Sequence, residues 1–298
     1  MVRKRNAFTL VELMIVAVIG LIISAAVVSI LRLFILDFEQ TYDITAARQR
    51  GEMVVSILEG PVLHAGLGMP DEGDLFGEAF ASGKSGELSG VAGRGGTIVV
   101  DGSASGDLYV TYAVPGGILT EESADFSAGS VLSPSLRTDV PSGMVEAFSG
   151  SASDTKNWVT FPTAGVPFLV TDTADPGRLG LKAFSAGSGK VALYDGLHYI
   201  RAMKAYVAAG PDGKRAFYTE DLTLGSPQPR VRGVEKIYFS FMDEVLSVYV
   251  LCRGNKEDAT MNAGRKIYGW DETVLPPIDA GSKRYRLAVT KGSWRIRN

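Results

Sequence analysis

The feature that most constrains this chain is an uninterrupted apolar segment close to its amino terminus. Leu13 to Leu31 comprises 19 consecutive uncharged, mostly aliphatic residues without a proline. An α-helix of this length extends about 28 Å, which matches the hydrocarbon core of a bilayer. Arg3, Lys4 and Arg5 precede the segment, and by the positive-inside rule they place the amino terminus in the cytoplasm. The sequence therefore predicts one membrane-spanning helix at about residues 13–31, with the rest of the chain across the membrane.

A cleaved secretory signal peptide explains this segment less well. Such signals have a shorter apolar core and a small-x-small cleavage site, whereas here the first charged residue after the run is Arg32 and no such site follows. A plain signal anchor leaves Glu12 unexplained, because an ionised carboxylate in lipid is costly unless it is paired or reaches the interface. Taken by itself, Glu12 is compatible with a helix end from which the carboxylate reaches the interface.

The residues around Glu12 carry a more specific pattern. The string RKRNAFTLVELMIVAVIGLII resembles the amino terminus of type IV prepilins and pseudopilins, with a short basic leader, a small residue, Phe-Thr-Leu-Val-Glu-Leu and an aliphatic helix. The resemblance implies that a dedicated prepilin peptidase removes leader 1–7 by cutting between Ala7 and Phe8, and then N-methylates Phe8. The family usually has glycine before the cut. Ala7 is small enough for the same site, so slower processing is expected rather than none.

Under this resemblance, Glu12 is the fifth residue of the mature chain and serves assembly. The new amine of Phe8 and the carboxylate of Glu12 are each costly in apolar surroundings, and they neutralise each other when helices stack with a stagger of a few residues. Setting register is the best-attested use of a buried ion pair, so Glu12 is expected to set the register of assembly.

Helical periodicity continues beyond the membrane segment. One apolar face recurs at spacings of 3, 4, 3 and 4 and consists of Ile44, Ala47, Gly51, Val54 and Leu58. Most polar residues fall elsewhere, namely Asp43, Arg48, Arg50 and Glu52. Gly60-Pro61 ends the pattern. We expect a helix over 8–60 whose first half packs in lipid and then in a filament core, and whose second half lies against a globular domain. The alternative is an anchor followed by an unrelated linker helix.

The body, residues 61–298, changes to the period-two alternation of strands. Nine glycines between Gly77 and Gly106 indicate loops around one short strand at 97–100. Further strands are expected over 107–114 (turned by Pro115-Gly116-Gly117), 167–171, 190–194, 198–208, 218–224, 234–242, 244–252, 284–289 and 294–297. In the last two, Tyr285, Leu287, Val289, Trp294 and Ile296 are expected inward, and Arg284, Arg286, Arg295 and Arg297 outward. Together these elements predict an α+β fold with a mostly antiparallel sheet.

The body also looks like that of PilW-type minor pilins, through the segments GDLYVTY, AYVAAGPDGKRAFYTEDL, QPRVRGVEKIYFSFMDE and KRYRLAVTKGSWRIRN. This implies a structural subunit that primes a type IV pilus or sits at its tip, supporting adhesion or twitching motility. Its partners would be other minor pilins, the major pilin, the prepilin peptidase and the inner-membrane assembly platform. It would move from the inner membrane, with a periplasmic body, into the pilus. The near alternative is a J-type pseudopilin of type II secretion, which shares the architecture but is usually shorter.

Composition argues against other classes. A formal net charge of −3 disfavours a nucleic-acid coat protein, and no nucleic-acid partner is expected. The single cysteine, Cys252, rules out an internal disulfide and a cysteine-based zinc site, and two histidines leave little for a metal cluster. Gly83-Lys84-Ser85 is no phosphate loop, because Glu78 occupies the position of the upstream glycine. We therefore predict no catalytic residue, metal or cofactor, and a buried Cys252 thiol.

Three charged segments could bind ligands, and each is interpreted here together with an alternative class of protein. The acidic turns Asp71–Asp74 (with Glu78) and Glu257-Asp258 do not match an EF-hand, and we interpret them as solvated turns. The closing segment 282–298, with six basic residues and no acid, is interpreted as a solvated strand face. A membrane-anchored periplasmic enzyme or binding domain is the alternative from another class. It would keep residues 1–7, tolerate Glu12→Ala and work as a monomer.

Overall fold

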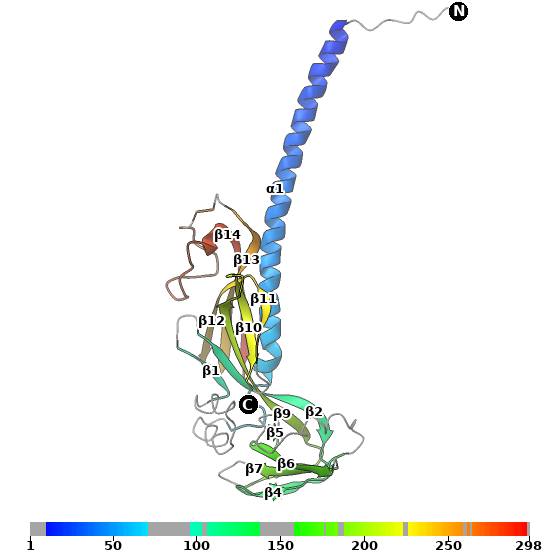
Figure 1. Ribbon diagram of the computed structural model, residues 1–298, viewed down its shortest axis with the longest axis vertical. Coiled ribbons are helices and arrows are strands. Elements are labelled where there is room, and N and C mark those ends of the chain that lie inside the picture. Colours follow the sequence, from blue (N-terminus) through cyan, green and yellow to red (C-terminus); the bar gives the residue numbers. More distant parts are fainter. Residues whose placement is uncertain are drawn as a thin grey trace, which may run out of the picture.

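The computed structural model describes residues 10–70, 96–102, 106–137, 158–175, 177–183, 188–222, 226–258, 261–262 and 264–296. Its one long helix, α1 (Leu10–Leu63), stands beside a body of strands whose pairings are all antiparallel in these ranges. Figure 1 shows that the first half of α1 projects well beyond the body, while its second half runs along the sheet. The chain therefore has the predicted α+β, pilin-like layout.

The strands of the described residues form three sheets. The largest has the order β1-β2-β9-β5-β6-β7-β4, with β10 paired to β9 and β11 to β10. Its strands are β1 (Ile98–Val100), β2 (Leu108–Leu119), β4 (Val131–Leu132), β5 (Trp158–Thr160), β6 (Pro167–Asp175), β7 (Arg178–Ala183), β9 (Gly196–Ala209), β10 (Arg215–Asp221) and β11 (Pro227–Arg232). The second sheet contains β12 (Val234–Met242), β13 (Val245–Glu257) and β14 (Tyr285–Arg295), preceded by the 3-10 turn η4 (Ser282–Arg284). The third pairs β3 (Ala124–Phe126) with β8 (Gly189–Val191).

Two main apolar cores divide the body into two lobes. In the helix-side lobe, one face of α1 packs against β12–β14 through residues such as Val54, Leu58, Val248 and Trp294. The distal lobe has a separate core, which includes Phe126, Phe161, Phe168, Leu179 and Leu181. Strands β2 and β9 contribute to both cores and so connect the lobes. The distal lobe lies at the end of the molecule opposite the amino terminus (Figure 1).

The buried stripe of α1 confirms most of the predicted face and corrects its first member. Ala47, Gly51, Val54 and Leu58 are buried, but Ile44 is 37% exposed and Asp43 is buried in its place. The helix also continues through Pro61 to Leu63, beyond the end that the sequence suggested. The backbone N–H and the imidazole Nδ1 of His64 both bond the carbonyl oxygen of Gly60, which satisfies the last turn.

Several predicted strands are confirmed in outline, and three are corrected. The predicted strand 190–194 is confirmed only at its start, because β8 ends at Val191 and residues 193–194 form a turn. β12 and β13 form the predicted hairpin, and Asp243 and Glu244 both adopt positive φ (50° and 61°), as a type I′ turn requires. Strand β2 runs past the predicted turn at residues 115–117, because a bulge between Pro115 and Ile118 absorbs the extra residues. The predicted strands 284–289 and 294–297 form the single strand β14.

The inward face predicted for this last strand is wrong in part, because the second face of the β12–β14 sheet is also covered near the start of β14. Trp294 and Ile296 pack in the helix-side core. Leu287 and Val289 lie on the opposite face, where they contact a cluster built on Trp270. Odd and even positions of one strand point to opposite sides, so covering both sides buries residues of both parities.

Candidate assembly site

The first half of α1 presents an apolar surface that nothing in the described body covers. Every residue from 10 to 38 is exposed. The helix contains an 18-residue window of mean hydropathy 2.9 with no buried residue, which makes it long and apolar enough to cross a membrane. A contiguous apolar surface of this extent requires lipid or other apolar helices around it.

Glu12 lies in the first turn of this helix and is exposed. No other charged residue follows it until Arg32. A carboxylate is favoured electrostatically at a helix amino terminus, where the backbone N–H groups carry partial positive charge. Ala7 and Phe8, the residues of the expected cleavage and methylation, lie outside the described part of the chain.

The second half of α1 is held on the body by polar contacts at its edges. The Arg50 guanidinium donates to the Arg253 carbonyl oxygen and to Asn255 Oδ1 on β13. The Lys256 ammonium lies 2.7 Å from Glu39 Oε1, and this hydrogen bond and the charge of Glu39 raise the pKa of Lys256. Together with the apolar stripe, these polar contacts fix both the position of the helix along β13 and its rotation about its own axis.

Asp43 is the buried member of this contact network. It is 2% exposed, and its Oδ1 accepts the backbone N–H of Asn255 at 3.3 Å. Nη1 of Arg286 lies 3.9 Å from Asp43 Oδ2, which is an electrostatic contact rather than a hydrogen bond, while Nη2 donates to Asp258 at 2.9 Å. A Cβ at Gly254 would lie 3.0 Å from that of Asp43, so glycine leaves room for the aspartate. The sequence did not predict this role. Asp43 lies four residues before Ala47, and this spacing, which places both on one face of the helix, was the one indication of it.

The cysteine and His198, the other candidate functional groups of the sequence, are held within the fold of the body. Cys252 is buried as predicted, and burial raises the pKa of its thiol to about 12. His198 Nδ1 bonds the carbonyl oxygen of Gly196. In the described ranges, no group of three or more His, Cys, Asp or Glu residues is placed to hold a metal ion. The acidic turn at residues 71–78 lies outside these ranges.

The charged segments near the carboxyl terminus pair with acids of the same chain, and Arg284, Lys291 and Arg295 are exposed as predicted for a solvated face. Arg284 contacts Glu257 at 3.4 Å and Arg286 contacts Asp258, so arginines neutralise the second acidic turn. Other cations of the closing segment contact acids of the same chain, in the pairs Lys283–Glu272 (2.7 Å) and Arg295–Glu244 (3.5 Å). Arg286, predicted outward, has a side chain only 14% exposed. Arg297 lies outside the described residues.

Comparison with known proteins identifies one family model. Residues 2–28 match the prokaryotic N-terminal methylation motif. No curated protein and no solved structure matches the chain. The motif, the single apolar helix behind it and the antiparallel body support a membrane-anchored protein of the type IV pilin-like class. That class is structural rather than enzymatic, is processed by prepilin peptidases and assembles with other pilins.

Proposed function

We propose that this protein is a minor pilin of the PilW type, a structural subunit that primes a type IV pilus or occupies its tip. The observation that carries the proposal is the exposed apolar half of α1, which has Glu12 in its first turn and overlaps the methylation motif at residues 10–28. A helix that served only as an anchor would need no carboxylate at this position. The body would be periplasmic before assembly and exposed at the cell surface afterwards.

The proposed mechanism separates the work of the two halves of α1. Prepilin peptidase cuts between Ala7 and Phe8 and methylates the new amine, which then pairs with a Glu12 carboxylate during stacking. The apolar half moves from lipid into a core shared with other minor pilins and the major pilin, driven by the inner-membrane assembly platform. Because Asp43 and Arg50 hold the second half on β13, a displacement of the helix carries the body with it.

The decisive measurement is the amino-terminal residue of the mature protein. Mass spectrometry of protein purified from cells with an active prepilin peptidase should show a chain that begins at methylated Phe8. An intact leader in such cells would instead favour a membrane-anchored periplasmic enzyme or binding domain.

A substitution at Glu12 tests the pairing. We expect Glu12→Ala to remain in the membrane but to fall at least about tenfold in the sheared filament fraction, because the amine of Phe8 loses its counter-charge. The matched control is Glu52→Ala, which removes an exposed acid from the second half of the same helix. Equal incorporation of both variants would reject the pairing mechanism. Pilus yield and protein secretion, measured in the same strains, distinguish a pilus subunit from a type II secretion pseudopilin.

A further inference from the structure

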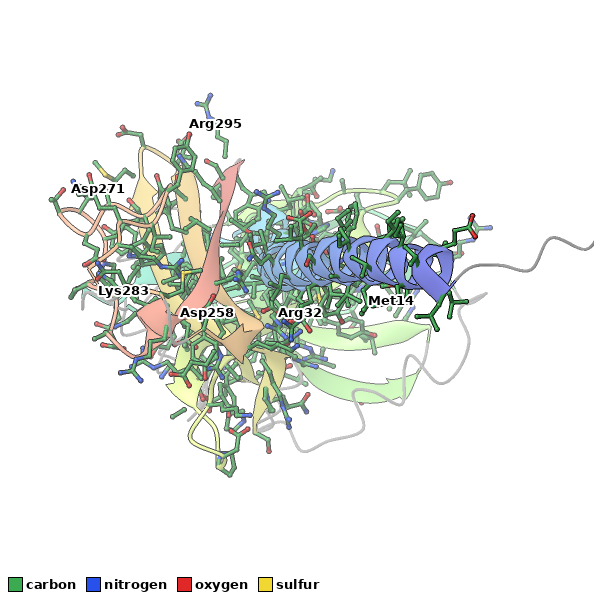
Figure 2. The ribbon with its side chains drawn as sticks, turned by 90° about the horizontal axis from the view of Figure 1, so that it is seen from above. Met14, Arg32, Asp258, Asp271, Lys283 and Arg295 are labelled. Carbon is green, nitrogen blue, oxygen red and sulfur yellow. The ribbon has the colours of Figure 1, made fainter. Side chains whose placement is uncertain are left out.

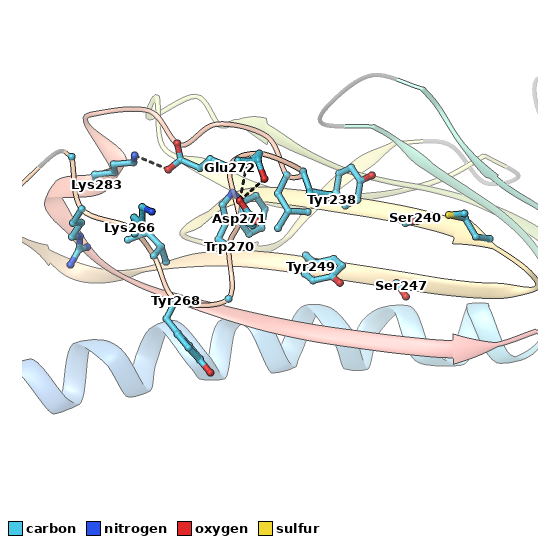
Figure 3. Close-up of a pocket in the computed structure, with 18 residues that line it drawn as sticks. Tyr238, Ser240, Ser247, Tyr249, Lys266, Tyr268, Trp270, Asp271, Glu272 and Lys283 are labelled. Atoms are coloured by element: carbon cyan, nitrogen blue, oxygen red, sulfur yellow. Dashed lines mark hydrogen bonds and ion pairs between the residues drawn. The ribbon is translucent and has the colours of Figure 1, made fainter.

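The second sheet carries a groove on the face that α1 does not cover. Helix α1 packs on one side of β12–β14, and the segment 264–275 stands on the other side and encloses a groove of about 1060 Å³. Figure 3 shows Tyr238 and the Trp270–Glu272 segment on the side of the strands opposite α1. In the view along the helix, Asp271 lies beyond the sheet, far from α1 (Figure 2).

The floor of the groove combines an aromatic row with a hydroxyl row. Tyr238 of β12 is paired in register with Tyr249 of β13, and their ring centroids lie 6.3 Å apart at an angle of 57°. The next row on the same face pairs Ser240 with Ser247, and Ser293 of β14, outside the groove lining, has its Oγ 3.4 Å from that of Ser247. The floor therefore offers tyrosine rings and hydroxyl groups side by side, and one face of the Tyr249 ring is in cation–π contact with Lys291, whose Nζ lies 5.0 Å from the ring centroid.

The wall of the groove is a fixed loop with charged groups of both signs. Trp270 anchors it, because this residue is only 3% exposed and its Nε1–H donates to the Pro276 carbonyl oxygen at 2.9 Å. Asp271 Oδ1 accepts the backbone N–H and the hydroxyl of Thr273 at 3.0 and 2.8 Å, and these bonds lower the pKa of Asp271. The ion pair between Lys283 and Glu272 also lines the wall. The Tyr268 side chain on this wall is fully exposed.

We propose that this groove binds a neutral oligosaccharide. The C–H faces of a pyranose ring carry partial positive charge and match the negative π-face of tyrosine. Sugar hydroxyls donate and accept, and the groove supplies partners for both roles: serine and threonine hydroxyls, carboxylates and ammonium groups. A purely apolar ligand would leave these groups desolvated and unpaired.

The charges of the groove argue against a charged polymer as the ligand. Three cations line it (Arg265, Lys266 and Lys283) against two carboxylates (Asp271 and Glu272), and two of these groups already pair with each other. The backbone of an extended peptide presents N–H donors and carbonyl acceptors alternately, but it has no C–H ring face to lie against the tyrosine rings. Outward display of the groove in a filament rests on the proposed function, because it requires α1 to be buried in the core. Binding by the isolated chain does not require this.

The test measures sugar binding by the full-length protein in a detergent without a sugar headgroup. Saturation-transfer difference NMR and calorimetry are run with cellohexaose, chitohexaose, maltohexaose and lacto-N-tetraose as probes. We expect at least one probe to bind, with Tyr249→Ala weakening it about tenfold and Tyr249→Phe close to the parent protein, since stacking needs only the ring. Ser247→Trp, which fills the groove, should abolish binding. Tyr194→Ala removes a tyrosine that is 64% exposed outside the groove and should have no effect.

Three outcomes would overturn the inference. They are binding of none of the probes, binding that survives both Tyr249→Ala and Ser247→Trp, and an equal loss in Tyr194→Ala. Circular dichroism identifies a variant that fails to fold. If one groove variant does not fold, the sugar binding of the other groove variant tests the inference. Because the assay contains no filament, failure here leaves the proposed assembly function standing, and failure of assembly leaves the binding result intact.

Discussion

At the scale of single residues, Asp43 is the group whose environment differs most from a sequence-based expectation. It lies on the buried stripe of a helix whose neighbouring positions are apolar, and its partners come from β13 and β14. A buried carboxylate is tolerated when hydrogen bonds and a cation compensate its lost hydration. Here the N–H of Asn255 and the guanidinium of Arg286 provide that compensation. Because burying the Asp43 carboxylate costs free energy, the stability of the fold should depend on Asp43 and on its partners.

We predict that Asp43→Ala lowers the free energy of unfolding by about 1–3 kcal/mol, because it removes the acceptor of the part-buried Asn255 N–H and one of the two acids beside Arg286. Asp258 still pairs with Arg286, which keeps the loss below that of a fully broken buried ion pair. Chemical unfolding of the full chain in detergent, followed by near-UV circular dichroism, measures this. Glu52→Ala, an exposed acid on the same helix, should change stability by less than about 0.5 kcal/mol. Equal stability of the two variants would show that Asp43 contributes nothing.

Cys252 makes stability depend on pH in the alkaline range. Burial raises the pKa of its thiol from 9.0 to about 12. Above pH 9 the unfolded thiol ionises while the folded one stays protonated, so its contribution is complete below pH 9 and is lost as the pH rises toward 12. Between pH 8.5 and 10.5, the native protein should lose about 2 kcal/mol more than Cys252→Ala. Parallel pH profiles of unfolding for the two proteins would contradict the assignment.

At the scale of elements, the contact between α1 and β14 depends on a glycine. A Cβ at Gly51 would lie 2.6 Å from the Cβ of Thr290, so only glycine permits the observed approach of the helix to the strand. Gly60, in the last turn of the same helix, has open space where its side chain would be. The two glycines therefore differ in function although both are helical.

Alanine substitutions at these two glycines should have different effects on the free energy of unfolding. Gly51→Ala should cost about 1–3 kcal/mol, because the clash with Thr290 exceeds the gain in helix propensity. Gly60→Ala should be neutral or stabilise the protein by up to about 1 kcal/mol. Adding Thr290→Gly to Gly51→Ala should recover part of the loss. Thermal unfolding of the four proteins measures this, and a similar effect of both alanine substitutions would exclude the close contact as the cause.

At the scale of the whole molecule, two separate cores suggest two units of local stability. Phe168 is central to the distal lobe. Its ring packs edge-on against those of Phe126 and Phe161, with ring centroids 5.2 Å and 5.6 Å apart. The helix-side lobe has its own core and shares only the long strands β2 and β9 with the distal lobe. Loss of packing in one core should therefore be felt mainly within that core.

Phe168→Ala should destabilise the distal lobe by about 3–5 kcal/mol through the cavity it creates. Hydrogen exchange with mass spectrometry should show faster exchange in β5–β7 and unchanged protection in β12–β14. The reciprocal variant Val250→Ala, in the helix-side core, should show the reverse pattern. Faster exchange in both lobes of either variant would indicate a single cooperative unit.

The sequence by itself determined the features that are encoded locally. The apolar run of α1, its buried positions from Ala47 to Leu58, and the β12–β13 hairpin each follow from residues within one element. The periodicity of a helix or strand needs only its own neighbours, and the turn at Asp243 is set by the residues beside it. The burial of Cys252 could be predicted for the same reason, since it shares a strand face with Val248 and Val250.

Only the tertiary structure decided which face of each element is covered and which charges meet. Asp43 and Asn255 are 212 positions apart, and no local pattern relates them. The sequence could not show that the second face of β14 is partly covered at Leu287 and Val289, because that cover comes from the Trp270 segment rather than from the strand itself. The groove arises in the same way, since the segment 264–275 and two paired strands must come together before it exists. Long-range packing supplies these contacts, and periodicity within one element contains no information about it.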